Sequence, residues 1–194
     1  MELPAHSSQA VTLTATIAAR PDGCLRLAVV ADTHSQPNAS GLEHLAALAP
    51  DAILHAGDVG DLMVLERLAA IAPTFAVKGN IDGRASTLPD ALVVKLVDGG
   101  QTALTILLTH IALAGPRLRA DAAKLARGTR ASVVVCGHSH VPFIGQDRGL
   151  SIFNPGSIGP KRFQLPILFG VLELDRQRVR LRHVDCATGA QWTP

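Results

Sequence analysis

The segment from Leu25 to Ser35 reads LRLAVVADTHS, an apolar run that ends abruptly in Asp32-Thr-His34. A continuous apolar run of this length is typical of a strand that is buried on both faces of a sheet. On a strand, residues i and i+2 point the same way, so we expect Asp32 and His34 to share one side of its carboxyl end. A carboxylate beside a neutral imidazole favours a divalent transition metal. A capping Asp next to a solvated His would give the same tripeptide.

The composition is that of a globular protein. The chain has 194 residues, of which 47% are hydrophobic and 18% charged, with a net charge of +2. Aromatic residues are scarce and the charge is small, so we expect no stable binding of nucleic acid. The three cysteines form no CxxC pair, which indicates reduced thiols and a cytoplasmic location. We find no signal peptide and no apolar stretch long enough for a bilayer, so we expect no membrane association.

Strands and helices alternate in the first half of the chain, and β-structure dominates the second half. A capping box at Ser40-Gly-Leu-Glu43 predicts a helix over 40–49, and further helices are predicted over 61–72 and 117–126. Asp98-Gly99-Gly100 predicts a hairpin between strands 91–97 and 102–109. The other predicted strands are 25–31, 52–56, 74–78, 132–136, 142–146, 150–153, 167–175 and 178–184. This order predicts an α/β fold of four layers, with two mixed β-sheets packed together and helices on the outer faces.

One domain is predicted over residues 25–194. Residues 1–24 form an N-terminal extension, in which residues 11–17 alternate between apolar side chains and threonine. This alternation predicts an edge strand, with a loose tail as the alternative.

The ends of the predicted central strands carry polar side chains that can bind a metal. Gly57-Asp58 and Gly79-Asn80 are also ordinary turn signals, and His110 at a strand end could be a buried core histidine. Two histidines directly after a glycine, as in Gly137-His138-Ser139-His140, seldom serve packing. Because the carboxyl ends of parallel strands meet at one crevice, the joint occurrence predicts one site. Its candidate residues are Asp32, His34, Asp58, Asn80, His110, His138 and His140.

These motifs, taken in order with Asp82 and Asn154-Pro155-Gly156-Ser157, resemble the calcineurin-like metallophosphoesterases. The similarity is greatest to the small bacterial and archaeal phosphodiesterases (YfcE-like) and extends from about Arg26 to the C-terminus. The resemblance implies the four-layer metallophosphoesterase sandwich. It also implies hydrolysis of a small phosphoester by a hydroxide that bridges two divalent metals.

The resemblance further implies a role for each site residue. Asp32, His34, Asp58 and His140 would hold one metal, and Asp58, Asn80, His110 and His138 the other, so that Asp58 bridges. The ligand types favour Mn²⁺, with Fe, Ni, Co or Zn²⁺ as alternatives. Asp82 is the candidate that moves a proton through water, although it could also cap a turn. Asn80 and Arg162 are candidates for substrate contact.

The sequence departs from the family pattern at Ile111-Ala112, where similar proteins often carry Gly-His. A histidine there would border the substrate, so we expect modest turnover. Other functions stay open: a phosphomonoesterase or nucleotide pyrophosphatase on the same centre, a non-catalytic interaction scaffold similar to the Vps29 subunit of retromer, or a nuclease. The seven ligand types favour an enzyme over a scaffold. A homo-oligomer is left open as well.

Overall fold

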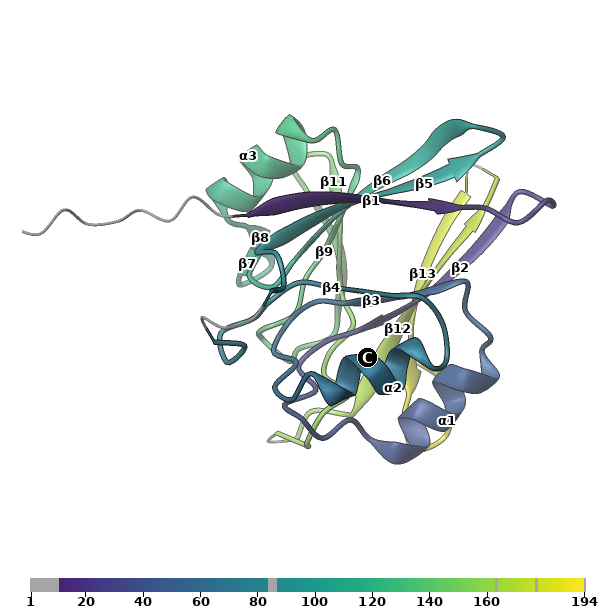
Figure 1. The fold of residues 1–194 in the computed structure, drawn as a ribbon. Helices are drawn as coiled ribbons and strands as arrows, with labels where there is room; N and C mark the ends of the chain where they lie inside the picture. The colour runs from purple at the N-terminus through teal and green to yellow at the C-terminus, as the bar shows by residue number, and fades with distance from the viewer. Residues whose placement is uncertain (1–10, 84–86, 163, 177, 194) are drawn as a thin grey trace, which may run out of the picture.

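Two six-stranded mixed sheets stack face to face in the computed structural model, which describes residues 11–83, 87–162, 164–176 and 178–193 (Figure 1). Sheet A has the order β1 (Thr12–Ala18), β5 (Ala91–Asp98), β6 (Gln101–Thr109), β9 (Val133–Val135), β11 (Leu150–Asn154), β10 (Phe143–Asp147). Sheet B has the order β14 (Gln191–Trp192), β13 (Arg178–Asp185), β12 (Leu168–Asp175), β2 (Cys24–Val30), β3 (Ala52–His55), β4 (Thr74–Ala76). β7 (Leu113–Ala114) and β8 (Arg117–Leu118) form a small separate pair.

Alternating side chains of the buried strands build separate apolar layers. Leu27 and Val29 of β2 belong to the cluster between the two sheets, whereas Ala28 and Val30 face the helices on the other side of sheet B. Those helices are α1 (Ala39–Ala47) and α2 (Met63–Ala69), while α3 (Ala120–Gly128) covers the outer face of sheet A (Figure 1). Each large side chain buried in this way contributes about 1.5–3 kcal/mol. The predicted fold class, with helices outside two packed sheets, is confirmed.

Most predicted elements are present, and the differences lie at their ends. The hairpin around Asp98-Gly99-Gly100 pairs β5 with β6. Helix α1 is capped by Asn38, whose side chain accepts the N–H of Gly41, and not by Ser40 as predicted. The predicted helix over 117–126 begins only at Ala120, because Arg117 and Leu118 pair with β7. The short β14 was not predicted at all.

The first strand, β1, lies at the edge of sheet A and runs parallel to β5 over seven paired residues, Thr12–Ala18. Ile17 is 8% exposed and belongs to the cluster between the sheets, with Ala15 packed against that cluster. This part of the N-terminal extension therefore contributes to the core. No helix in the described ranges is both long and apolar enough to cross a membrane.

Candidate metal centre

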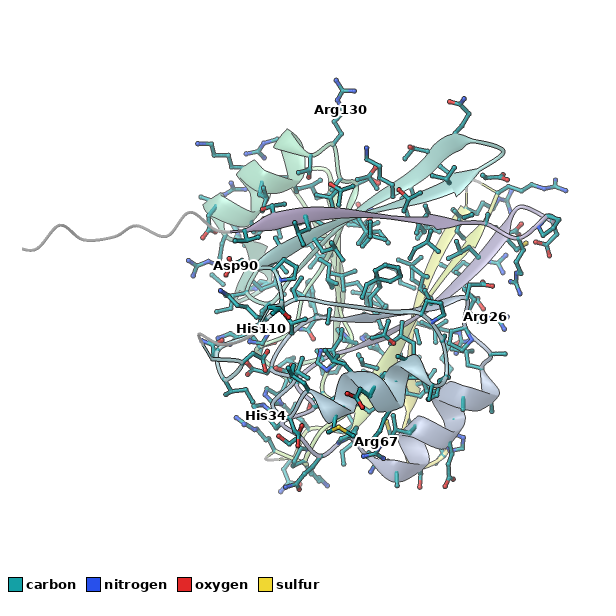
Figure 2. The ribbon with its side chains drawn as sticks, in the orientation of Figure 1. Arg26, His34, Arg67, Asp90, His110 and Arg130 are labelled. Atoms are coloured by element: carbon teal, nitrogen blue, oxygen red, sulfur yellow. The ribbon has the colours of Figure 1, made fainter. Side chains whose placement is uncertain are left out.

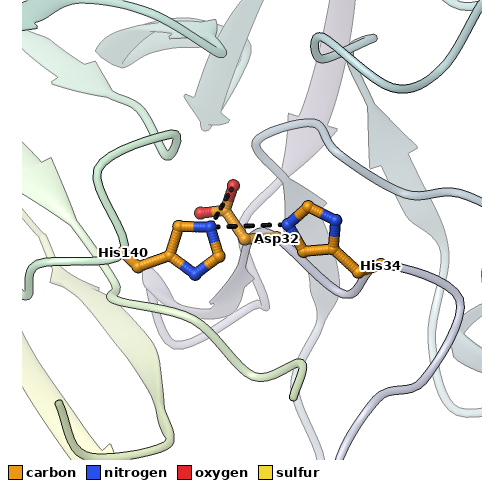
Figure 3. Close-up of side chains that lie close together, drawn as sticks. All are labelled: Asp32, His34 and His140. Carbon is orange, nitrogen blue, oxygen red and sulfur yellow. Dashed lines mark hydrogen bonds and ion pairs between the residues drawn. The ribbon is translucent and has the colours of Figure 1, made fainter. Parts of the chain in front are cut away.

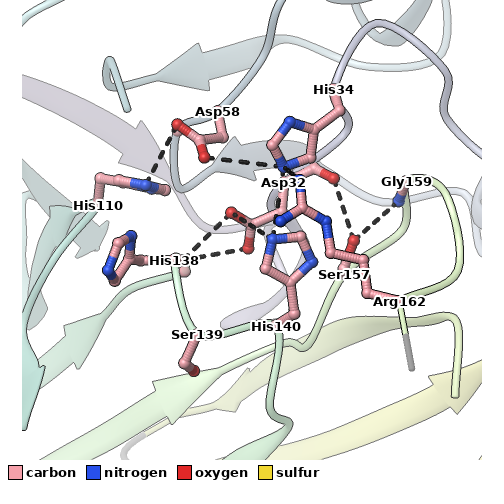
Figure 4. Close-up of polar contacts among 12 residues, drawn as sticks. Asp32, His34, Asp58, His110, His138, Ser139, His140, Ser157, Gly159 and Arg162 are labelled. Atoms are coloured by element: carbon pink, nitrogen blue, oxygen red, sulfur yellow. Dashed lines mark hydrogen bonds and ion pairs between the residues drawn. The ribbon is translucent and has the colours of Figure 1, made fainter. Parts of the chain in front are cut away.

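The seven candidate ligands follow strands of both sheets. Asp32 and His34 come after β2, Asp58 after β3, Asn80 after β4, His110 after β6, and His138 and His140 after β9. β2, β3 and β4 run parallel in sheet B, and β6 and β9 run parallel in sheet A, so their carboxyl ends carry the loops of the site. Figure 4 shows six of these side chains, all but Asn80, gathered in one place.

Five of the seven candidates have a left-handed backbone conformation, which is uncommon outside glycine. Their φ angles are 55° at Asp32, 45° at His34, 55° at Asp58, 70° at His138 and 58° at His140. The direction of these side chains is therefore set by tight turns after the strands. Asp32 and His34 point into the same site, as expected, but strand alternation is not the cause, because β2 already ends at Val30. Strained backbone of this kind clusters at functional sites.

One group of three ligand atoms comes from Asp32, His34 and His140, which lie within 4.8 Å of one another (Figure 3). Nε2 of His140 lies 3.4 Å from Nε2 of His34 and 3.7 Å from Oδ1 of Asp32. The carboxylate of Asp32 is fully buried and also accepts the backbone N–H of His138. Two imidazole nitrogens and a carboxylate oxygen in one pocket match the donors that divalent transition metals prefer.

A second group consists of Asp32, Asp58 and His110. Nδ1 of His110 lies 2.8 Å from the carbonyl oxygen of Ala56, and because a carbonyl only accepts, this nitrogen carries the proton. Nε2 of neutral His110 then presents a lone pair. It is buried, has no hydrogen-bond partner among the described residues, and lies 3.3 Å from Oδ1 of Asp58. The other Asp58 oxygen, Oδ2, lies 3.7 Å from Nε2 of His34 (Figure 4). The carboxylate of Asp58 thus faces both groups.

Asn80 and His138 lie at the solvent side of the second group. Both side chains are exposed. The ring of His138 meets that of His110 edge-on, with centroids 5.2 Å apart, and Asn80 lines a cavity together with His110. The site therefore has a buried floor and an open side through which a substrate can enter.

The electrostatics of the site keep most of the imidazoles neutral. Burial lowers the pKa of His34 and brings that of His140 to about 4, and in each case the nearby Arg162 lowers it further. Burial raises the pKa of Asp32 to about 7. Burial also acts to raise the pKa of Asp58, but the contacts with His110 outweigh it and hold that pKa below its ordinary value. Neutral imidazoles beside a buried carboxylate fit a divalent metal.

Residues 25–177 match the model of the calcineurin-like phosphoesterase superfamily domain. The chain belongs to this superfamily. It is 29% identical over 185 residues to a probable metallophosphoesterase of Methanocaldococcus jannaschii, covering 93% of this chain and 91% of the relative.

Solved structures share the fold. Vps29 of Entamoeba histolytica superposes with a TM-score of 0.70 at 20% identity, over 87% of this chain and 96% of that one. The phosphoesterase Yfce of E. coli gives 0.60 at 23% identity, over 87% and 97%. The predicted family is thus confirmed. As a calcineurin-like phosphoesterase, the chain is a metallophosphoesterase, a hydrolase of phosphoric esters that uses divalent metals.

Buried polar residues behind the phosphoesterase site fix its loops. Nδ1 of His55 accepts the N–H of Gly57, so Nε2 carries the proton and donates to Thr33, 3.0 Å away. Asp82 is buried, and its two carboxylate oxygens accept the N–H groups of Gly60 and Gly79. Each oxygen keeps a second lone pair for water, so the predicted proton transfer by Asp82 stays a prediction.

Asn154 and Ser157 hold the loops from the other side. The buried amide of Asn154 donates to the carbonyl of Gly137 and to Oγ of Ser139, while its oxygen accepts the N–H of Gly156. The hydroxyl of Ser157 donates to the carbonyl of Asp32. Asn-Pro-Gly is by itself a local turn signal, and the contacts of Asn154 and Ser157 with distant ligand loops have no local signal in the sequence.

Arg162 extends into the site. Its Nη2 lies 3.2 Å from Nε2 of His34, and since a guanidinium only donates, that nitrogen of His34 accepts (Figure 4). Arg162 is exposed. A substrate phosphate beside His34 would therefore lie within reach of a cation that can bind two oxygens at once.

Contrary to our expectation, Ala112 does not border the site. It is 1% exposed and packs in the apolar cluster beneath α3, whereas Ile111 lines the cavity beside His110. An imidazole at position 112 would have to enter this cluster. Ile111 is thus the residue of the pair that gives the cavity an apolar wall.

Proposed function

We propose that the chain is a metal-dependent phosphodiesterase with two divalent cations. Asp32, His34, Asp58 and His140 would hold one cation, and Asp58, Asn80, His110 and His138 the other. Mn²⁺ is proposed as the resident metal on the basis of nitrogen and oxygen ligands without thiolate, with Fe, Co, Ni and Zn²⁺ as alternatives.

One observation carries this proposal: the carboxylate of Asp58 faces two different histidines with its two oxygens. Oδ1 lies 3.3 Å from Nε2 of His110 and Oδ2 lies 3.7 Å from Nε2 of His34. A carboxylate in this position can bind a cation through each oxygen. When bound, the two cations supply the Lewis acidity that activates water and clamps the phosphate oxygens.

The chain's own side chains would orient the substrate and move protons. The exposed amide of Asn80 can donate to a phosphate oxygen at the open side of the site. The guanidinium of Arg162 can bind two phosphate oxygens from the other side. The carboxylate of Asp82, which lies behind the loop that carries Asn80, would relay a proton through water, taking up the proton that the attacking water loses and returning it to the departing alcohol.

A substrate panel tests this function. The protein, loaded with Mn²⁺ and in parallel with Zn²⁺, Co²⁺ and Ni²⁺, is assayed with bis(p-nitrophenyl) phosphate, p-nitrophenyl phosphate and dinucleotide pyrophosphates. We expect the diester to have the highest kcat/KM. A higher kcat/KM for the monoester would contradict the proposed diesterase activity and support a phosphomonoesterase. A higher kcat/KM for the pyrophosphate would support a pyrophosphatase.

The scaffold alternative rests on the similarity to Vps29, which at 20% identity concerns the fold alone. A scaffold would bind metal without hydrolysing any ester of the panel. The complete set of ligand types supports an enzyme. A cytoplasmic location and the oligomeric state stay predictions.

A further inference from the structure

A cavity of about 260 Å³ opens beside the half of the site that contains His110. One wall is the segment after β4, which contributes Lys78 and Asn80. The others are Asp90, directly before β5, and the end of β6 with His110 and Ile111. Figure 2 shows Asp90 and His110 on the same side of the molecule. Two candidate metal ligands, Asn80 and His110, therefore also line this cavity, and a group attached to a bound phosphate can extend into it.

Lys78 is held at the wall of the cavity by an ion pair. Its Nζ lies 2.9 Å from Oδ1 of Asp90, and its backbone N–H donates to the carbonyl of Pro89. The side chain is 37% exposed. An ammonium group has three N–H donors, and the bond to Asp90 uses one of them. A ligand oxygen in the cavity can accept from the others.

The position of Lys78 depends on the first strand. Oδ2 of Asp90 accepts the N–H of Val11 at 2.7 Å, and the N–H groups of Asp90 and Ala91 donate to the carbonyl of Val11. Asp90 thus joins the start of β1 to Lys78. Because β1 precedes residues 25–177, it lies outside the part of the chain that matches the family model.

The charges and size of the cavity restrict its occupant. Among its described lining residues Lys78 is the only lysine or arginine, and the one carboxylate, Asp90, has an oxygen on Lys78 and the other on Val11. Ile111 gives an apolar wall suited to a short carbon chain. A volume of about 260 Å³ lies below the range of roughly 300–1,000 Å³ for drug-sized ligands, so only a short group fits inside the cavity.

We infer that this cavity is a specificity subsite in which Lys78 binds a carboxylate or second phosphate carried on the short alcohol part of the substrate. The inference rests on the proposed phosphodiesterase function, since it presumes a phosphate beside Asn80 and His110. Lys78 would act on binding of the substrate and not on the chemical step.

The test compares two phosphate monoesters that differ in one group. 3-Phosphoglycerate carries a carboxylate where glycerol 3-phosphate carries a hydroxymethyl group, and both resemble products of diester hydrolysis. Their dissociation constants are measured by calorimetry on the Mn²⁺-loaded protein, and their inhibition constants against bis(p-nitrophenyl) phosphate. The variants are Lys78→Met and Lys78→Arg, with Lys95→Met as the control, because Lys95 is exposed on β5 and does not line the cavity.

We expect the parent to prefer 3-phosphoglycerate by about tenfold, as a charge-assisted hydrogen bond allows. Lys78→Met should bring the ratio near one, Lys78→Arg should keep most of it, and Lys95→Met should not change it. Equal binding of both ligands by the parent, or an unchanged ratio in a folded Lys78→Met, would overturn the inference. The binding ratio does not depend on turnover, so a protein with the preference but without diesterase activity would refute only the proposed function.

Discussion

Nε2 of His110 lies 3.3 Å from Oδ1 of Asp58, and the hydrogen bond from Nδ1 to Ala56 leaves that nitrogen without a proton in the neutral ring. Two lone pairs therefore face each other inside the protein. Burial lowers the pKa of His110, but the contact with Asp58 outweighs it and raises that pKa, so this pair binds a proton more readily than a free imidazole does. A divalent metal would replace that proton, which makes metal binding release protons.

The first prediction concerns Asp58. Asp58→Asn removes the charge that faces both His34 and His110, so both metals should bind more weakly, and activity should fall at least about a hundredfold. His34→Ala should mainly weaken one metal. Elemental analysis after equilibration with saturating Mn²⁺ gives the stoichiometry. A parent protein that takes up at most one metal per chain would contradict the dinuclear proposal.

The second prediction concerns Gly79, which the sequence marked only as part of a turn. A Cβ at this position would collide with the backbone N and the carboxylate Oδ1 of Asp58. Gly79→Ala should therefore displace Asp58 and reduce metal affinity, with a loss of stability of about 1–3 kcal/mol. Gly128→Ala is the matched control, because a Cβ there meets nothing within 4 Å, and helix propensity favours alanine. Equal metal affinity of the two variants would show that Asp58 tolerates the shift.

Sequence reasoning found the strands because buried strands are continuous apolar runs, such as Val133–Val135 of β9. It also placed the candidate ligands at strand ends, since the motifs follow those runs directly. The reason given for their orientation was wrong. Left-handed turns at residues such as Asp32 and His140 direct the side chains. Asp and His adopt this conformation more often than most residues, but the residue type alone does not predict it.

Contacts between distant segments could not be predicted from the sequence. Val11 and Asp90 are far apart in the chain, and the bond between them exists only because β1 pairs with β5. In the same way, Ala112 faces the cluster beneath α3 because the chain turns into β7 and β8 directly afterwards. Patterns within one element contain no information on such packing.

The third prediction concerns pH and His55. This residue is fully buried, and burial lowers its pKa to about 4. The unfolded chain takes up a proton at its ordinary pKa near 6.5, whereas the folded chain does so only near 4, so stability is complete above about pH 6.5 and is lost as the pH falls. The loss amounts to about 3 kcal/mol by pH 4.

Chemical denaturation at about pH 7.5 and pH 5 measures this dependence. His55→Gln, which retains a donor toward Thr33 but does not titrate, should weaken the pH dependence while lowering stability at neutral pH. If the variant keeps the parent's full pH dependence of stability, groups other than His55 cause it.

The fourth prediction concerns the N-terminal extension. Deleting residues 1–10 should leave metal content and turnover unchanged, because no candidate ligand lies there. Deleting residues 1–18 removes β1 and the buried Ile17, which should cost about 2–5 kcal/mol. Thermal unfolding and elemental analysis of both truncations check this. Loss of metal from a folded protein that lacks only residues 1–10 would refute it.

The last prediction concerns Arg162, whose Nη2 lies 3.2 Å from Nε2 of His34. If the guanidinium binds the substrate phosphate, Arg162→Ala should lower kcat/KM by about tenfold to a hundredfold, since charge-assisted and bidentate hydrogen bonds are the strong ones. Metal stoichiometry should stay the same, because the guanidinium only donates and so cannot be a ligand. Arg162→Lys should recover part of the loss, since a lysine supplies the charge without the two-pronged geometry.

The neighbouring Lys161 provides the control. It is exposed and lies in the same loop, but the structure gives it no contact with a candidate ligand among the described residues. Lys161→Ala should therefore change kcat/KM less than twofold or so, as expected for a surface charge at moderate ionic strength. Steady-state kinetics on bis(p-nitrophenyl) phosphate and on an alkyl diester compare the two variants. If Arg162→Ala and Lys161→Ala behave alike on both substrates, Arg162 does not bind the phosphate, and its contact with His34 belongs to the metal-free site alone.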